Sequence, residues 1–249
     1  MSAAHALALV AAGIAAGTIN TVVGSGTLIT FPVLLALGYP PVVANVSNTI
    51  GLVPGSISGV IGYRAELRGQ RHRIYSLTPA SVIGSAIGAA LLLSLPASAF
   101  KAIVPVFIAI ALAAIIAQPR LVTIIGAHRD GARRRPGPLL LAGVALTGVY
   151  GGYFGAAQGI MLIAILSLAI DDTLQRVNAL KNVLAGCVNL VAGVIFALVA
   201  QVAWGAAALL AIGAVLGGMI GARWGRRLPP DALRGVIVLV GAVAIVRLI

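Results

Sequence analysis

The feature that most constrains this chain is a series of apolar runs that recur from one end to the other. Each is about twenty residues long, enough for a helix to span a hydrocarbon core of about 30 Å. Only 9% of the 249 residues are charged, whereas soluble domains carry about a quarter. We therefore predict an all-α polytopic membrane protein without a sizeable soluble domain, so the lipid bilayer is an expected partner.

Basic residues cluster in the short segments between the apolar runs. They concentrate at 63–73, 128–136 and 223–227, and the formal net charge is +12. Lys and Arg in short loops mark the cytoplasmic side of a membrane protein. This pattern favours a multi-pass protein of a bacterial-type inner membrane and argues against nucleic acid as a partner. The first run lacks a basic n-region, so we expect a retained helix and not a cleaved signal.

Two of the expected helices, 27–38 and 158–170, are too short to cross a bilayer alone. Each follows a glycine-rich break, at 22–27 and 151–159. About eight to ten transmembrane or half helices follow from the run lengths, with the breaks forming re-entrant hairpins. The full set of expected helices is 3–23, 27–38, 42–63, 74–95, 98–117, 138–156, 158–170, 174–200, 203–222 and 231–249.

The two halves of the chain match in the order of their elements. Residues 17–24 align with 148–155, and further on Gly26 aligns with Gly159 and Asn45 with Asn178. The basic loops give the halves opposite orientations, which predicts inverted repeats, an architecture common among secondary transporters. The predicted divisions are a first transmembrane repeat at 1–117, a cytoplasmic basic linker at 118–137 and a second transmembrane repeat at 138–249.

Lys181 stands inside the predicted span 174–200, roughly 12 Å from its start at 1.5 Å per residue. A buried ammonium group is expensive and usually faces a cavity or a partner. All five acidic residues fall in loops or at helix ends, so we expect a small anionic substrate to be the partner. The alternative is that the side chain snorkels to the nearer interface. A buried lysine is also a candidate to carry a coupling proton.

The glycine breaks would direct helix N-termini, which favour anions, into the interior. The alternative is that these glycines only allow close helix packing. Polar residues follow both breaks and can donate to an oxyanion, and Tyr150 is a candidate gate. The predicted substrate-binding residues are Gly24, Ser25, Gly26, Thr27, Asn45, Ser47, Asn48, Thr49, Tyr150, Gly155, Gln158, Gly159, Asn178, Lys181 and Asn182.

Nothing in the sequence resembles a phosphate-binding loop, a metal-ligand cluster or a nucleophile–base pair. We therefore expect no catalytic residues, no metal and no cofactor, and predict a secondary transporter, ion-coupled or facilitative, for a small anion. One alternative is a permease for a cation, which the lack of intramembrane carboxylates disfavours, or for another solute. The other is a membrane assembly subunit that does not transport.

Residues 17–49, "GTINTVVGSGTLITFPVLLALGYPPVVANVSNT", resemble the N-terminal signature of the sulfite exporter TauE/SafE family, and 151–182 look like its second copy. The second copy departs at "GAAQG" and at Lys181, where the family often has small polar residues. The resemblance implies a permease of about eight spans for sulfite, sulfonates or related organic anions. The residues that carry the first match are Gly24, Gly26, Pro32, Leu37, Gly38, Pro40, Ala44, Asn48 and Thr49.

Overall fold

The computed structural model describes residues 2–126, 137–225 and 235. These residues form nine helices and no strand. Residues 127–136 of the predicted linker 118–137, and the predicted helix 231–249 apart from residue 235, lie outside the described residues. The helices are α1 (Ala3–Val22), α2 (Thr27–Ala36), α3 (Pro41–Gly62), α4 (Arg71–Ser94), α5 (Ala97–Gly126), α6 (Pro138–Tyr153), α7 (Gln158–Ala169), α8 (Leu174–Val199) and α9 (Trp204–Trp224).

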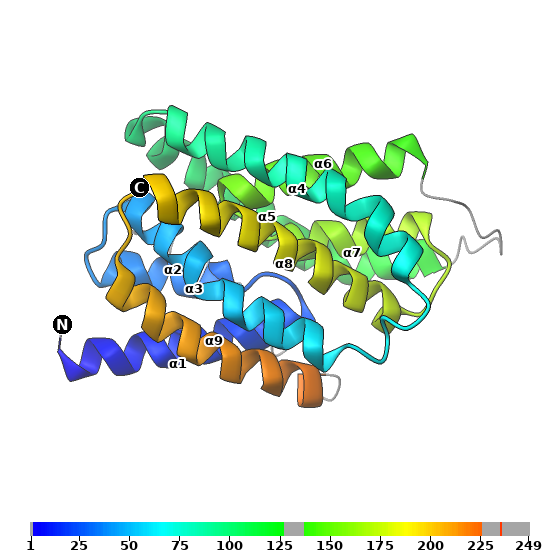
Figure 1. Cartoon of the computed structure of the whole chain (residues 1–249), viewed down its shortest axis with the longest axis horizontal. Helices are drawn as coiled ribbons and strands as arrows, with labels where there is room; N and C mark the ends of the chain where they lie inside the picture. Colours follow the sequence, from blue (N-terminus) through cyan, green and yellow to red (C-terminus); the bar gives the residue numbers. More distant parts are fainter. Residues whose placement is uncertain (1, 127–136, 226–234, 236–249) are drawn as a thin grey trace.

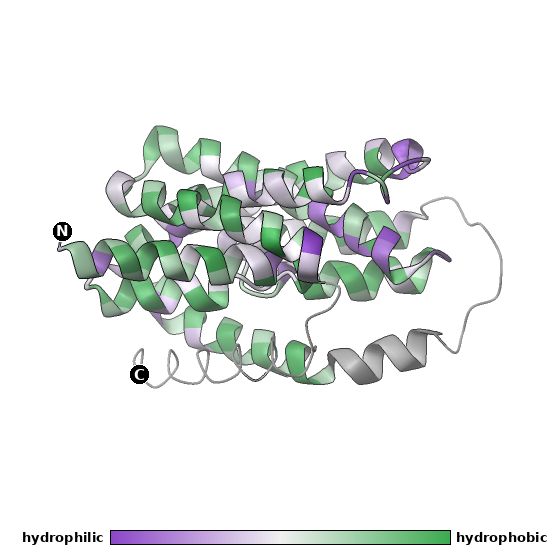
Figure 2. Ribbon diagram, turned by 90° about the horizontal axis from the view of Figure 1, so that it is seen from below, coloured by the Kyte–Doolittle hydropathy of each residue, from purple (hydrophilic) through white to green (hydrophobic). Residues whose placement is uncertain are grey.

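The helices form a bundle with an apolar outside. Five of the described helices, α1, α4, α5, α8 and α9, are long and apolar enough to cross a membrane. Large apolar side chains cover the flanks, and Leu146 and Leu198 are 69% and 78% exposed. Figure 2 shows hydrophobic residues along the helices, with hydrophilic residues gathered mainly toward one end. Such a surface suits lipid, and the chain is an all-α polytopic membrane protein.

The short helices turn back instead of continuing across the bundle (Figure 1). Helix α1 runs inward from the end of the molecule that carries the N-terminus, and α2 returns to that end before α3 crosses. Helix α6 starts from the opposite end, and α7 returns there before α8 crosses. Each broken hairpin therefore enters and leaves at one end, and the two hairpins enter from opposite ends.

Helices of each half pack against helices of the other half. Helix α1 packs on α9 as α6 packs on α4, and α3 packs on α9 as α8 packs on α4. Helices α3 and α8 pack on each other. If α1–α4 correspond to α6–α9, each contact in this set has its counterpart. The packing is compatible with the predicted inverted repeat.

Small residues allow the closest of these contacts. A Cβ on Gly17 of α1 would lie 2.3 Å from the carbonyl oxygen of Ala214 on α9. In the other half, a Cβ on Gly88 of α4 would lie 2.1 Å from the carbonyl oxygen of Val149 on α6. Neither position has room for a side chain, as expected where small residues bring membrane helices together. Close packing therefore explains these glycines, which lie away from the two breaks.

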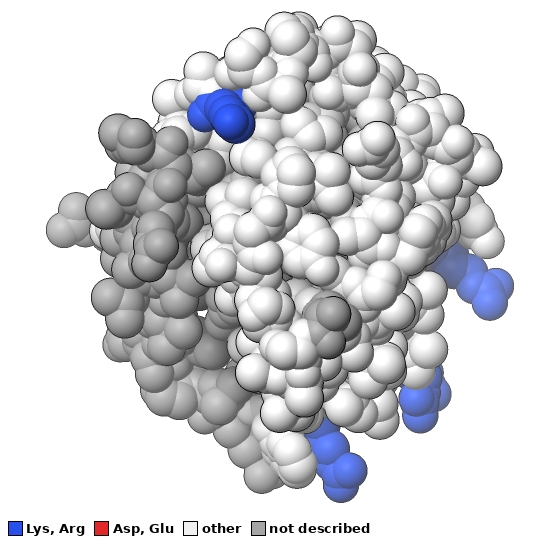
Figure 3. Space-filling model, turned by 90° about the vertical axis from the view of Figure 1, so that its left-hand side faces the viewer, with Lys and Arg blue, Asp and Glu red and all other residues white. Residues whose placement is uncertain are grey.

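The two ends of the bundle differ in charge. Figure 3 looks at the end near the N-terminus, where few basic side chains and no acidic ones are visible. The opposite end, which we call the basic end, carries residues 63–73 and the α7–α8 connection with Asp171 and Asp172. Part of the basic segment is helical, because α4 starts at Arg71 and not at residue 74 as predicted. Similarly, α5 continues to Gly126 beyond the predicted end at 117.

Candidate functional site

The two glycine breaks end α1 and α6 in the same way. Gly24 and Gly155 have φ angles of +88° and +75°, in the left-handed region that favours glycine. The Gly24 N–H donates to the carbonyl of Ile19, and the Gly155 N–H donates to that of Tyr150, each at 3.0 Å. A left-handed glycine with such a bond is a common helix C-terminus. Each break therefore ends one helix before a short helix begins.

The two breaks touch each other. The N–H of Gly159, in the first turn of α7, donates to the carbonyl of Gly24 at 3.0 Å. A Cβ on either glycine would lie 2.4 Å from the Cα of the other, a separation that real side chains do not reach. Glycine at these positions is thus required by backbone contact between the two halves. Gly24 and Gly159 are 135 residues apart in sequence, and the two breaks form one junction.

Lys181 is fully buried beside this junction. Its Nζ donates to the carbonyls of Asn20 and Thr21 at 2.9 and 3.3 Å and to Oδ1 of Asn182 at 2.7 Å. Asn20 and Thr21 lie in the last turn of α1, where carbonyls have no intrahelical donor and the helix dipole is negative. No carboxylate of the described residues lies within ion-pair distance of Lys181. The ammonium therefore caps the broken end of α1 and does not extend to the membrane interface.

Asparagines from the long helices cap the broken helices of the other half. Asn178 of α8 donates through Nδ2 to the carbonyl of Thr21 at 3.1 Å, and Asn182 does so at 3.2 Å. Asn45 of α3 donates through Nδ2 to the carbonyl of Tyr153 at the end of α6, at 2.9 Å. Side chains of α8 thus hold α1, and a side chain of α3 holds α6.

A threonine cluster holds the start of α2. Asn48 donates through Nδ2 to the hydroxyl of Thr27 at 3.1 Å and accepts a hydrogen bond from the hydroxyl of Thr30. The Thr30 hydroxyl also lies 3.3 Å from the carbonyl of Gly26. Sequence reasoning did not find Thr30, although it is a buried polar residue one turn after Gly26. The sequence signal for Thr30 was its position one turn after Gly26 on a short helix.

Two predicted site residues, Ser47 and Thr49, form hydrogen bonds with backbone groups that lie outside the two breaks. The hydroxyl of Ser47 accepts a hydrogen bond from the N–H of Ala203 in the α8–α9 connection, at 2.9 Å. The hydroxyl of Thr49 donates to the carbonyl of Asn45 on its own helix, at 3.0 Å. Ser47 lies two residues after Asn45, on the opposite side of α3, and faces the α8–α9 connection. Thr49 lies one turn after Asn45 on a similar face, but its hydroxyl bonds back to its own helix. Their buried polarity has a structural explanation.

Several buried polar atoms at the junction have no hydrogen-bond partner among the described residues. Ser25 Oγ and Gln158 Nε2 belong to the two breaks, and Asn45 Oδ1 and Asn178 Oδ1 belong to the asparagines that cap them. A buried polar group left unpaired costs about 1–3 kcal/mol. Such groups in a native structure point to a ligand, an ion or water. Their gathering at one junction marks it as the candidate binding site.

Aromatic rings pack over the second break. The ring of Phe31 on α2 lies edge-on to Phe154, with centroids 5.1 Å apart, and to Phe100 on α5 at 6.3 Å. Tyr150 packs edge-on to Phe107 at 5.2 Å, and its hydroxyl lies beside the backbone of Ala157, just before α7. The sequence did not indicate this cluster, because its members come from separate helices. It encloses one side of the junction in apolar surface.

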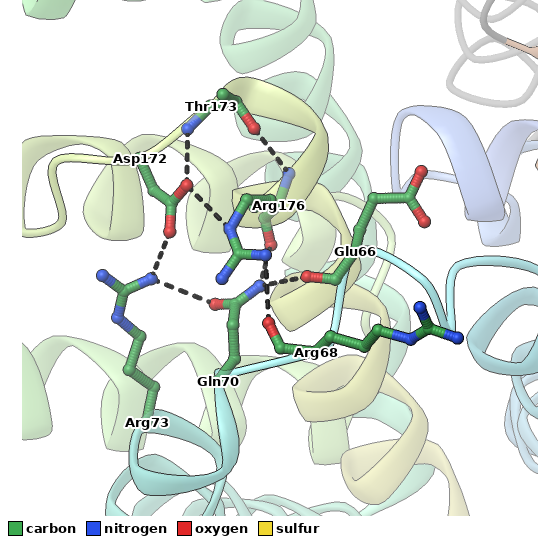
Figure 4. A network of polar contacts seen from close by, with 7 residues as sticks. All are labelled: Glu66, Arg68, Gln70, Arg73, Asp172, Thr173 and Arg176. Atoms are coloured by element: carbon green, nitrogen blue, oxygen red, sulfur yellow. Dashed lines mark hydrogen bonds and ion pairs between the residues drawn. The ribbon is translucent and has the colours of Figure 1, made fainter.

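A second polar network lies at the basic end (Figure 4). Asp172 accepts from Nη1 of Arg73 at 2.5 Å and pairs with Nε of Arg176 at 2.8 Å. Gln70 donates to the carbonyl of Arg176 at 2.9 Å, and Arg176 donates to that of Arg68 at 3.0 Å. The network ties the α3–α4 connection to the start of α8. Around it is a cavity of about 540 Å³, lined by Gly69, His72, Arg73, Asp171, Asp172 and Arg176.

The aspartate at the centre of this network remains ionised at neutral pH. Partial burial by itself raises the pKa of Asp172, but hydrogen bonds from Arg73 and Arg176 offset that effect. The N–H of Thr173 donates to the same carboxylate at 2.9 Å. Together these donors hold the pKa of Asp172 below its usual value. The network is therefore a charged tie between two parts of the basic end.

The broken helices meet inside an apolar bundle and carry buried, unpaired polar groups. These features are typical of polytopic membrane transporters. The sequence model of the sulfite exporter TauE/SafE family matches residues 9–248, and the chain belongs to this family. No solved structure matches the chain.

Three curated relatives agree with this assignment. The chain is 27% identical to the probable membrane transporter protein YfcA of Escherichia coli over 94% of this chain and 86% of that protein. It is 28% identical to a probable membrane transporter protein of Haemophilus influenzae over 85% and 81%. It is 28% identical to the probable membrane transporter protein ORF9 of a Sinorhizobium species over 98% and 93%. The chain is a multi-pass membrane transporter of a small molecule.

Proposed function

We propose that the protein is a secondary transporter that moves a small anion across a bacterial-type inner membrane by alternating access. The substrate is sulfite, a sulfonate or a related sulfur-containing or organic anion. The observation that supports this most is the meeting of the two breaks beside a buried lysine, with unpaired polar atoms around them. The sulfur chemistry of the substrate rests on the family description.

The proposed site draws on both halves of the chain. Ser25 and Gln158 supply unpaired buried side chains, and the N–H of Thr27, the first amide of α2, has no backbone acceptor among the described residues. These groups would bind the oxygens of the anion. Lys181 supplies the positive charge nearby, although its protons point at the end of α1. The other proposed members are Gly24, Gly26, Thr27, Asn45, Asn48, Tyr150, Gly155, Gly159, Asn178 and Asn182, with Tyr150 as the gate.

Alternating access follows from the proposed inverted repeat. The two hairpins enter from opposite ends and meet at the backbone contact between Gly24 and Gly159 and at the rings of Phe31 and Phe154. Rocking of one half against the other around this contact would open the junction to each side in turn. The full burial of Lys181 is what a closed form of this cycle would require. Either a coupling ion or the gradient of the anion itself would drive transport.

Flux into proteoliposomes tests the proposal. We expect wild-type protein to move at least one of sulfite, thiosulfate and sulfoacetate, with chloride as the control anion. Lys181→Gln removes the buried charge and should abolish this flux in a protein that stays folded. Arg176→Gln is the matched control, because Arg176 is a second cation on α8 that lies at the basic end. Wild-type protein that moves none of the sulfur anions would contradict the proposed substrate class.

A further inference from the structure

The Lys181 ammonium lies in a shell of oxygen atoms. Its three acceptors are the carbonyls of Asn20 and Thr21 and the amide oxygen of Asn182, at 2.7–3.3 Å. Two of these oxygens are backbone atoms at the broken end of α1, which also carries the negative end of the helix dipole. The described residues add no carboxylate to this shell. Neutral and partly negative oxygens alone therefore surround a full positive charge.

This shell has the composition of an inorganic cation site. Hard cations bind carbonyl, amide and carboxylate oxygens. In secondary transporters built from broken helices, the coupling Na⁺ is held by unwound backbone carbonyls and by the C-terminal ends of half helices. The end of α1 supplies such carbonyls, but an ammonium group on a covalent stem occupies the position.

The stem of the lysine passes through the junction. A Cβ on Gly159 would lie 3.0 Å from Cδ of Lys181, so the lysine chain runs beside the start of α7 on its way to α1. In the described part of the chain no cation contacts the end of α6, where the Tyr153 carbonyl accepts from the neutral amide of Asn45. Among these residues the positive charge therefore lies at the first break only.

We propose that the Lys181 ammonium is a tethered cation that fills a monovalent-cation site at the broken end of α1. The site is then satisfied by the chain itself, and the protein needs no Na⁺ or K⁺ there. This inference deepens the proposed transport function by naming what holds the positive charge beside the anion. Its first test, however, measures binding and does not depend on flux.

The test empties the site and offers it free cations. Lys181→Ala removes Cγ, Cδ, Cε and Nζ, which are the heavy atoms of n-propylammonium. Thermal unfolding of this variant in detergent is measured in choline chloride, with Na⁺, K⁺ or n-propylammonium replacing choline stepwise. We expect n-propylammonium and at least one alkali cation to raise the unfolding temperature by several degrees and to saturate. Wild-type protein and Lys181→Met, whose apolar chain fills the space, should not respond.

Other results overturn the inference. An equal rise of the unfolding temperature in Lys181→Ala, Lys181→Met and wild-type protein would show a general salt effect. Lys181→Ala that stays unfolded in every cation, or that is folded and indifferent to all of them, would show that the lysine is only a structural cap. A wild-type flux that requires Na⁺ or K⁺ would also contradict the tethered cation. Absence of any sulfur-anion flux in wild type, with the stability response intact, would contradict the proposed function alone.

Discussion

The two broken-helix ends have one backbone geometry and different side-chain chemistry. Each has a left-handed glycine whose N–H bonds to a carbonyl of the preceding helix at 3.0 Å. At the end of α1, three α8 side chains converge on two adjacent carbonyls, and one of them carries a full charge. At the end of α6, the contacting α3 side chain is the neutral amide of Asn45.

The fold and the chemistry of the junction therefore come from different residues. Glycines and small residues set the backbone path, and they act alike in both halves. The polarity of the site comes from the residues that face the breaks, and these differ between α3 and α8. A site between two similar backbones can therefore have a cationic side chain on one side and a neutral one on the other, which suits a substrate with a single charge.

The largest expected effect breaks the backbone contact that both ends share. Gly24→Ala places a methyl group 2.4 Å from Cα of Gly159 and strains a φ of +88°. Overpacking costs typically 1–3 kcal/mol and a strained backbone about as much again, so we expect little folded protein. Gly38→Ala is the control, because its φ of +86° is similar but nothing lies within 4 Å.

Size-exclusion profiles and thermal unfolding of the two glycine variants in detergent check this prediction. Gly38→Ala should lower stability by about 1–2 kcal/mol and remain folded. Equal losses in the two variants would mean that backbone conformation alone fixes Gly24, and that the contact between the breaks is unimportant.

Removal of one capping asparagine from each broken end should have a smaller effect. Asn45→Ala leaves the buried Tyr153 carbonyl without its side-chain donor, which should cost about 1–3 kcal/mol. Asn178→Ala leaves the Thr21 carbonyl with Lys181 and Asn182 as donors, so its loss should be about 1 kcal/mol or less. Chemical unfolding of both variants compares the two losses. A greater loss for Asn178→Ala would show that the α1 end is not over-supplied with donors.

The smallest effect lies away from the junction, in the network at the basic end. Asp172→Asn removes the charge that joins Arg73 to Arg176, and a partly exposed network of this kind contributes about 1 kcal/mol. Because the folded-state pKa of Asp172 is lowered, its contribution is present at neutral pH and is lost as pH falls through that value.

Thermal unfolding of wild type and Asp172→Asn as a function of pH measures that contribution. The gap between the two proteins should be constant near neutrality and close below about pH 3.8, the ordinary pKa of the group. A gap that stays the same in acid would mean that Asp172 acts through packing and not through its charge.

Most of the fold could be predicted from the sequence, because apolar run length and glycine breaks are local signals. The bounds of α2, α7 and α8 differ from the predicted ones by at most a residue or two. Two of the three acceptors of Lys181 could not be predicted, because they are backbone carbonyls of α1 and the sequence does not show which carbonyls are left unpaired. Similarly, polar content alone did not separate Asn45 and Asn48 from Ser47 and Thr49. The hydroxyls of the latter two bond to the backbone of Ala203 and Asn45.

Two buried serines provide the sharpest test of whether the junction of the two breaks is the substrate site. Ser25 has an unpaired hydroxyl at the first break, whereas the hydroxyl of Ser47 accepts from Ala203. In proteoliposomes, Ser25→Ala should raise the KM for sulfite about threefold to tenfold, the worth of one hydrogen bond, without loss of stability. Ser47→Ala should lower stability by about 1 kcal/mol and leave KM unchanged. An unchanged KM in Ser25→Ala, or a raised KM in Ser47→Ala alone, would contradict the claim.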